Sequence, residues 1–91
     1  MSTPSTSPRS AVTIVIKDYR YTVSGPAARG TKVTVKNSDD VAHTVTASDG
    51  KSFNVTVPAG KTVAFTAPRK PGSYPFVCNF HSNMQSRLTV K

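Results

Sequence analysis

Residues 12–17 read VTIVIK, a run in which the apolar residues at positions 12, 14 and 16 alternate with Thr13, Val15 and Lys17. A period of two is the pattern of a β-strand that buries one face. The run at 32–36, KVTVK, repeats the alternation. Similar short runs, rich in the Val, Thr, Phe and Tyr that suit a pleated sheet, occupy residues 44–47, 53–57, 62–66, 74–78 and 87–91. The chain is therefore predicted to be all-β.

Turn-forming residues separate the predicted strands. Glycine, proline, asparagine and aspartate punctuate the chain at residues 24–26, 29–30, 37–40, 49–50, 58–60 and 71–72. No stretch of the sequence carries the apolar face of a helix. Seven to eight short strands at spacings of about ten residues predict a Greek-key β-sandwich or a small barrel.

The length of 91 residues allows one domain. The first ten, MSTPSTSPRS, are rich in Ser, Thr and Pro, so we expect a flexible tail at residues 1–10 and the folded domain at residues 11–91. That tail lacks the apolar centre of a signal peptide, and no apolar run in the sequence is long enough to cross a membrane. The single cysteine excludes an intramolecular disulfide, which leaves a bound metal as the remaining cross-link for so small a domain.

The chain is strongly basic, with 12 Lys and Arg residues against 4 acidic residues and a formal charge of +8. The basic residues are scattered, and no RNA-recognition aromatic motif or helix-turn-helix pattern accompanies them. This distribution argues against a nucleic-acid-binding protein. The consequence that we expect of the charge is attraction of a protein partner with an acidic docking face.

Four residues of metal-ligand type, His43, Cys78, His81 and Met84, stand close to predicted turns. Three of them form a C-x2-H-x2-M motif before the last predicted strand, and His43 follows the turn at 37–40. A thiolate, two imidazoles and a weak thioether are the ligands of a type 1 (blue) copper site. Each residue taken alone would more often be structural. Both histidines and the only cysteine fit a single pattern, however, and this favours a metal site.

Other uses of these residues stay open at this stage. Zinc accepts Cys and His ligands, although a methionine ligand is uncommon in zinc sites. A Cys–His hydrolase would use Cys78 as nucleophile and a histidine as base, but no oxyanion-hole element is recognisable and Met84 would have no role. Two histidines are too few for a multicopper oxidase. A copper chaperone or storage protein that binds Cu(I) with the same ligands is the main alternative to an electron carrier.

Residues 74–84, YPFVCNFHSNM, resemble the ligand loop of plastocyanin, amicyanin and related cupredoxins, and the compact spacing is most similar to amicyanin. Residues 37–45, NSDDVAHTV, resemble the segment that supplies the first histidine ligand in this family. The similarity extends over residues 12–90. This chain differs from the family at Ser86, where glycine is common, and at the two neighbours of the loop histidine, where proline is common.

The resemblance implies a cupredoxin-like sandwich that binds one type 1 copper ion and transfers electrons without being an enzyme. It makes His43, Cys78 and His81 the copper ligands and Met84 the long axial ligand. The partners that it implies are larger redox proteins. It also implies a monomer outside the cytoplasm, in the periplasm or at the cell surface.

The resemblance further implies roles for residues around the ligands. Asn37 is expected to tie the two ligand-bearing segments together by hydrogen bonds, and Asn79 to influence the copper through hydrogen bonds near the sulfur. His81 is expected to lie near the surface in an apolar patch where partners dock. Phe80 either belongs to that patch or packs into the end of the sandwich.

Overall fold

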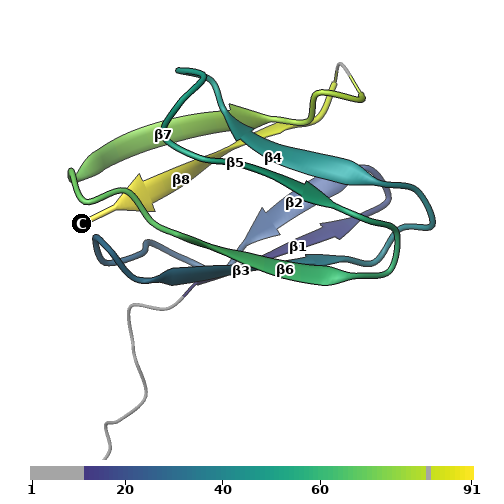
Figure 1. Cartoon of the computed structure of the whole chain (residues 1–91), viewed down its shortest axis with the longest axis horizontal. Helices are drawn as coiled ribbons and strands as arrows, with labels where there is room; N and C mark the ends of the chain where they lie inside the picture. Colours follow the sequence, from purple (N-terminus) through teal and green to yellow (C-terminus); the bar gives the residue numbers. More distant parts are fainter. Residues whose placement is uncertain (1–11, 82) are drawn as a thin grey trace, which may run out of the picture.

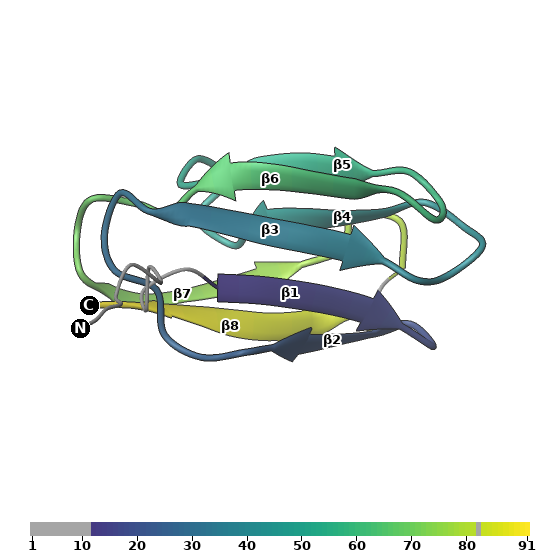
Figure 2. The same ribbon diagram turned by 90° about the horizontal axis from the view of Figure 1, so that it is seen from below.

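The structure is a computed structural model that describes residues 12–81 and 83–91, so the tail expected at residues 1–10 lies outside the described residues. Eight strands form two four-stranded sheets packed face to face (Figures 1 and 2). Their bounds are β1 Val12–Lys17, β2 Arg20–Val23, β3 Lys32–Asn37, β4 His43–Ala47, β5 Asn54–Val57, β6 Thr62–Thr66, β7 Gly72–Val77 and β8 Gln85–Val90. The predicted all-β sandwich is confirmed. Within the described residues there is no helix with the length and apolarity needed to span a membrane.

The two sheets have the strand orders β2-β1-β3-β6 and β5-β4-β7-β8. Neighbouring strands are antiparallel except β1 and β3, which run parallel. The chain changes sheet after β3, after β5 and after β6, as it does in Greek-key sandwiches (Figure 2). Contacts between β2 and β8 and between β5 and β6 close the two long sides of the sandwich.

The core lies between the sheets and follows the alternation seen in the sequence. The apolar residues of β1 at positions 12, 14 and 16 are all buried, as predicted. Fully buried side chains come from both sheets and include Ile14, Val35, Val45, Phe76 and Leu88. Burying each such side chain stabilises the fold by about 1.5–3 kcal/mol, so this core gives the strands a rigid framework.

Strand β2 is absent from the runs that periodicity predicted. It is only four residues long and pairs with β1 through a tight turn at Asp18 and Tyr19, whose φ angles are 54° and 61°. Two consecutive left-handed residues make a type I′ hairpin turn, which favours Asn, Asp or Gly at the first position and Gly at the second. Asp18 fits this preference, but Tyr19 occupies the position where glycine is usual, so the sequence signal is incomplete.

Candidate metal centre

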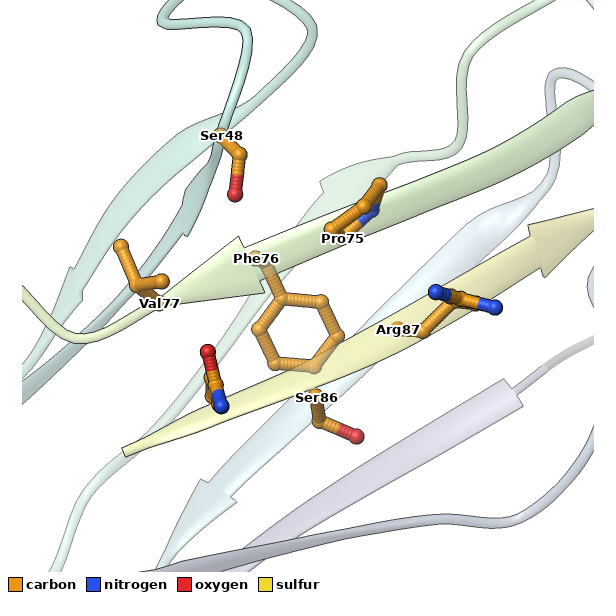
Figure 3. A pocket seen from close by; sticks show the side chains of 7 residues that line it. Ser48, Pro75, Phe76, Val77, Ser86 and Arg87 are labelled. Atoms are coloured by element: carbon orange, nitrogen blue, oxygen red, sulfur yellow. The ribbon is translucent and has the colours of Figure 1, made fainter. Parts of the chain in front are cut away.

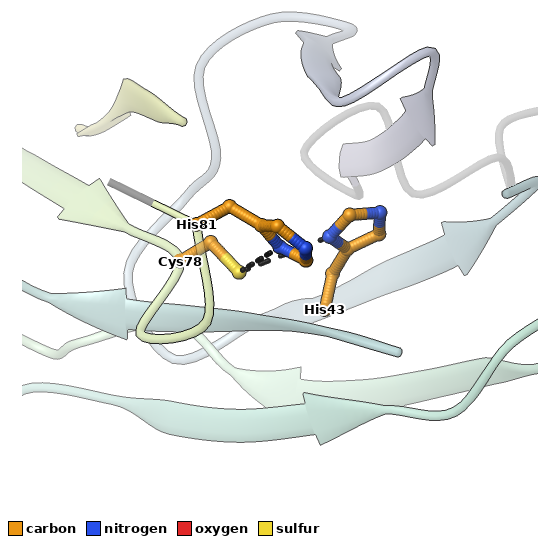
Figure 4. Close-up of side chains that lie close together, drawn as sticks. All are labelled: His43, Cys78 and His81. Atoms are coloured by element: carbon orange, nitrogen blue, oxygen red, sulfur yellow. Dashed lines mark hydrogen bonds between the residues drawn. The ribbon is translucent and has the colours of Figure 1, made fainter. Parts of the chain in front are cut away.

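Two imidazoles and a thiol converge at one end of the sandwich (Figure 4). The Nδ1 atoms of His43 and His81 lie 3.8 Å and 3.6 Å from the Cys78 sulfur. One ligand atom from each of the three residues lies within 4.8 Å of the others. His43 is fully buried and Cys78 nearly so, whereas His81 is partly exposed. The fold thus brings together three side chains that were predicted from the sequence to share a site.

Strand pairing explains how these side chains meet. His43 opens β4, and Cys78 directly follows Val77, the residue of β7 that pairs with Thr46 of β4. Because β4 and β7 are neighbours, the two ligand candidates lie side by side although 35 residues separate them.

Backbone hydrogen bonds make the loop after β7 compact. The Met84 N–H donates to the His81 carbonyl at 3.3 Å, and the Cys78 N–H donates to the Met84 carbonyl at 3.2 Å. These bonds turn the chain back on itself between Cys78 and Met84. They hold His81 beside the cysteine from which it is separated by only two residues.

Met84 is 3 % exposed and belongs to the same buried cluster as Cys78. It borders a hollow of ≈ 450 Å³ that opens at this end of the sandwich. The other residues around this hollow are Tyr19, Phe80, His81 and Asn83. Met84 and His81 therefore border the same hollow, and Met84 stays a predicted ligand.

A second hollow, of ≈ 460 Å³, lies over β7 and β8 (Figure 3). Its polar lining comes from groups such as the Ser48 hydroxyl and the Arg87 guanidinium. It contains neither imidazole nor thiol, so it does not share the chemistry of the cluster around Cys78.

The surroundings of the Cys78 sulfur favour the thiolate. Burial by itself raises the pKa of the thiol, but hydrogen bonds, first from His81 and then from the Thr44 and Phe80 N–H groups, outweigh it and lower the pKa to about 6. The Thr44 nitrogen lies 3.4 Å from the sulfur. Because the thiolate is the form of cysteine that binds metals, the site is prepared for a metal at neutral pH.

Thr44 joins the two ligand-bearing segments. Its buried hydroxyl oxygen accepts the Asn79 N–H at 2.8 Å and the Thr46 hydroxyl at 3.1 Å. The Asn79 side-chain amide in turn donates to the Thr46 hydroxyl oxygen at 3.2 Å. Asn79 therefore bonds next to the sulfur, in the region where its role was expected. Thr44 was not singled out from the sequence, although its place directly after His43 was an available signal.

A tyrosine hydroxyl also supports this strand. Tyr21 of β2 donates to the Thr44 carbonyl at 2.5 Å. Burial, followed by the nearby Cys78, raises the pKa of Tyr21, so its hydroxyl keeps the proton that it donates. Tyr21 lies 23 residues from Thr44, and no local pattern indicated the contact.

Asn37 acts differently from the expectation. Its buried amide donates to the carbonyls of Val41, Val57 and Pro58 at 2.8, 3.0 and 3.2 Å. Its oxygen accepts the Asp39 N–H at 2.9 Å. Asn37 thus shapes the loop that leads to β4, whereas the described side-chain bonds to Asn79 come from Thr44 and Thr46.

Asp39 and Tyr19 surround the histidines. An Asp39 carboxylate oxygen lies 2.8 Å from Nε2 of His43. Burial by itself raises the pKa of Asp39, but hydrogen bonds from the Tyr19 and Asp18 N–H groups and from His43 outweigh it and lower the pKa. The Tyr19 ring stands edge-on to His43 and His81, with centroids 5.1 and 4.7 Å away. Neither Asp39 nor Tyr19 was identified from the sequence.

The donor set suits copper. A thiolate selects Cu(I), and imidazole nitrogens suit both Cu(I) and Cu(II). The buried sulfur and the two imidazoles fit such an ion better than a hard, oxygen-preferring cation.

Comparisons with known proteins agree with this geometry. A model of the cupredoxin-like domain matches residues 1–90. Amicyanin from Paracoccus versutus (Thiobacillus versutus) is 21 % identical over 92 % of this chain and 84 % of its own, with a TM-score of 0.70. A reduced Cu(I) form of an amicyanin mutant at pH 4 is 20 % identical over 89 % and 82 % of the two chains, with a TM-score of 0.69. A search of curated proteins found no match. At such identities the structural likeness shows a shared fold.

Proposed function

Because the chain belongs to the cupredoxin-like domain family, we propose that it is an electron carrier that binds one type 1 copper ion. His43, Cys78, His81 and Met84 would hold the ion. The observation that carries this proposal is the convergence of two imidazoles on one sulfur, with one ligand atom from each of the three residues within 4.8 Å of the others. The copper ion, when bound, supplies the one-electron chemistry.

The protein's own residues hold the site in shape. Cys78 presents a thiolate, and the bonds of Thr44 to Asn79 and to the sulfur keep the loop in place. His43 is fully buried, which excludes water from the inner side. A preorganised site of this kind needs little rearrangement when its charge changes by one electron.

His81 is the exit for the electron. It is the partly exposed member of the cluster, whereas His43 and Cys78 are buried. Phe80, next to it, is 56 % exposed, and Tyr19 is 47 % exposed. Their exposure supports a docking patch around His81 over the alternative in which Phe80 packs into the end of the sandwich.

The partners are redox proteins with an acidic docking face, and the complexes are small and transient. The formal charge of +8 supports this, since opposite charges steer encounter. With small probes, oxidation by an anionic metal complex should slow as ionic strength rises, and oxidation by a cationic complex should accelerate. Rates that do not respond to salt with either probe would contradict electrostatic steering.

The carrier works as a monomer and is not itself an enzyme. The carrier is located in the periplasm or at the cell surface, as the resemblance to amicyanin and related cupredoxins implies. Cell fractionation with detection of the chain tests the location, and sedimentation of the copper-loaded protein tests the monomer.

The deciding experiment is a Cu(II) titration of the apo-protein followed by visible absorption. An intense thiolate-to-copper band that saturates at one copper per chain, and is missing in Cys78→Ser, supports the proposal. A matched control is Ser48→Ala, which changes a hydroxyl in the hollow over β7 and β8. Tight Cu(I) binding with no band in the Cu(II) form would instead indicate a copper chaperone or storage protein.

A further inference from the structure

A carboxylate lies behind the buried histidine of the cluster. Asp39 Oδ2 is 2.8 Å from Nε2 of His43, while Nδ1 of the same ring faces the Cys78 sulfur at 3.8 Å. The Asp39 side chain is only 9 % exposed, and the His43 side chain is 0 % exposed. The neighbouring Asp40, by contrast, is exposed. Asp39 therefore contacts the cluster, whereas Asp40, the next residue, faces solvent.

Asp39 is fixed in this orientation by further hydrogen bonds. The Asp18 N–H donates to Oδ1 at 2.7 Å, and the Tyr19 N–H donates to Oδ2 at 3.0 Å. The Asp39 N–H donates to the Asn37 side-chain oxygen at 2.9 Å. Both carboxylate oxygens are in use, so the side chain cannot turn away from His43 without breaking its bonds to the β1–β2 turn.

The carboxylate determines which nitrogen of His43 carries the proton. An ionised aspartate can only accept hydrogen bonds. A neutral imidazole beside it therefore keeps its proton on Nε2 and has its lone pair on Nδ1. That lone pair is on the side of the ring that faces Cys78.

We propose that Asp39 is a positioning residue of the metal centre, which holds His43 with its proton on Nε2 and its free Nδ1 toward Cys78, and whose negative charge favours Cu(II) over Cu(I). The part of this proposal that concerns copper rests on the proposed function. The same carboxylate anchors the turn that places the Tyr19 ring edge-on to His43 and His81.

The charge effect follows from the balance at the site. The Cys78 thiolate and the Asp39 carboxylate, when both are ionised, carry two negative charges. Together with Cu(II) they sum to zero, whereas together with Cu(I) they leave one net negative charge. An uncompensated charge in a largely buried site is costly, so the carboxylate stabilises the oxidised form more than the reduced form. The reduction potential is therefore lowered by Asp39.

The first test uses the metal-free protein. A long-range ¹H–¹⁵N spectrum of the histidine rings should show His43 of the wild type protonated on Nε2. In Asp39→Asn the amide can present either its oxygen or its N–H₂ to Nε2, so the ring is no longer held in one tautomer and a form protonated on Nδ1 should appear. Asp40→Asn removes the same charge one residue away and should leave the His43 tautomer unchanged.

The second test compares reduction potentials of the copper-loaded proteins. Loss of such a partner of a ligating histidine typically costs 10- to 100-fold in metal affinity. If the affinity for Cu(II) falls by this factor relative to the affinity for Cu(I), the reduction potential of Asp39→Asn rises by about 59 to 118 mV, at 59 mV per tenfold. Asp40→Asn should stay close to the wild type, because Asp40 is exposed and screened by solvent.

The two tests separate the parts of the proposal. A wild-type His43 protonated on Nδ1 overturns the positioning role, and this holds even if Asp39→Asn fails to fold. An equal rise of potential in Asp39→Asn and Asp40→Asn overturns the charge role. If the wild type binds no copper, the proposed function fails, while the tautomer measurement still decides what Asp39 does to His43.

Discussion

Replacing Thr44 with valine removes one oxygen from the hydrogen bonds that join β4 to the ligand loop. Valine has nearly the shape of threonine and suits a strand, so the packing around this 2 % exposed residue changes little. The Asn79 N–H loses its acceptor at 2.8 Å, and the Thr46 hydroxyl loses its partner at 3.1 Å. The Thr44 N–H bond to Cys78 stays, because it comes from the backbone.

The size of the effect depends on which group is left without a partner. The Thr46 hydroxyl keeps an alternative acceptor in the Asn54 side chain at 3.0 Å, so the uncompensated loss is that of the Asn79 N–H. A donor left unsatisfied when buried costs about 1–3 kcal/mol, and Asn79 is exposed enough for water to replace part of the bond. We expect the free energy of unfolding to fall by about 1 kcal/mol. In a domain of this size the melting temperature should then fall by about 4–8 °C.

Urea denaturation of the apo-protein measures this change. The matched control is Thr56→Val, because Thr56 pairs directly with Thr44 across β4 and β5 but is exposed. Thr44→Ser keeps the hydroxyl and should retain the bond to Asn79, but it loses one buried methyl group, which costs about 0.8 kcal/mol. Equal stability of Thr44→Val and Thr56→Val would refute the role given to the Thr44 oxygen.

Two further predictions concern the cysteine and the tyrosine. The pKa of Cys78, about 6, lies below that of the thiol in the unfolded chain, near 8.5. The free energy of unfolding of the apo-protein should therefore rise with pH between these values, and the contribution of Cys78 should be lost as the pH falls through about 6. Urea denaturation at several pH values measures this slope, which Cys78→Ser should abolish; an unchanged slope in that variant contradicts the assignment. Tyr19→Ala uncovers both imidazoles and should speed copper release to a chelator, whereas Tyr19→Phe keeps the ring and should match the wild type. Equal release rates in all three proteins would show that the ring does not shield the site.

Much of the fold was predictable because a strand with one buried face shows a local alternation of apolar and polar residues in its sequence. The period of two in residues 12–17 coincides with β1, and the run at 62–66 coincides with β6. The last strand begins at Gln85, two residues before its predicted start, because Gln85 pairs with Val77 of β7. That extension depends on a partner strand, which periodicity does not describe.

Strand β2 could not be predicted, for a related reason. Asp18 and Tyr19 both adopt positive φ, although Tyr19 occupies the position where a type I′ turn usually has glycine. The Asp39 carboxylate accepts both of their N–H groups, and it lies 21 and 20 residues further along the chain. The turn is stabilised by a distant residue, so its own sequence does not reveal it.

The sequence by itself determined which donors are available and that three of them share one short loop, because ligand type and spacing are local properties of the chain. The tertiary structure decided how they are used. The pairing of β4 with β7 brings His43 to Cys78, and Asp39 and Thr44 act through contacts with Tyr19, 20 residues away, and Asn79, 35 residues away. Hydrogen bonds are short and directional, so the groups that orient a ligand are known only when the strands that carry them have packed together.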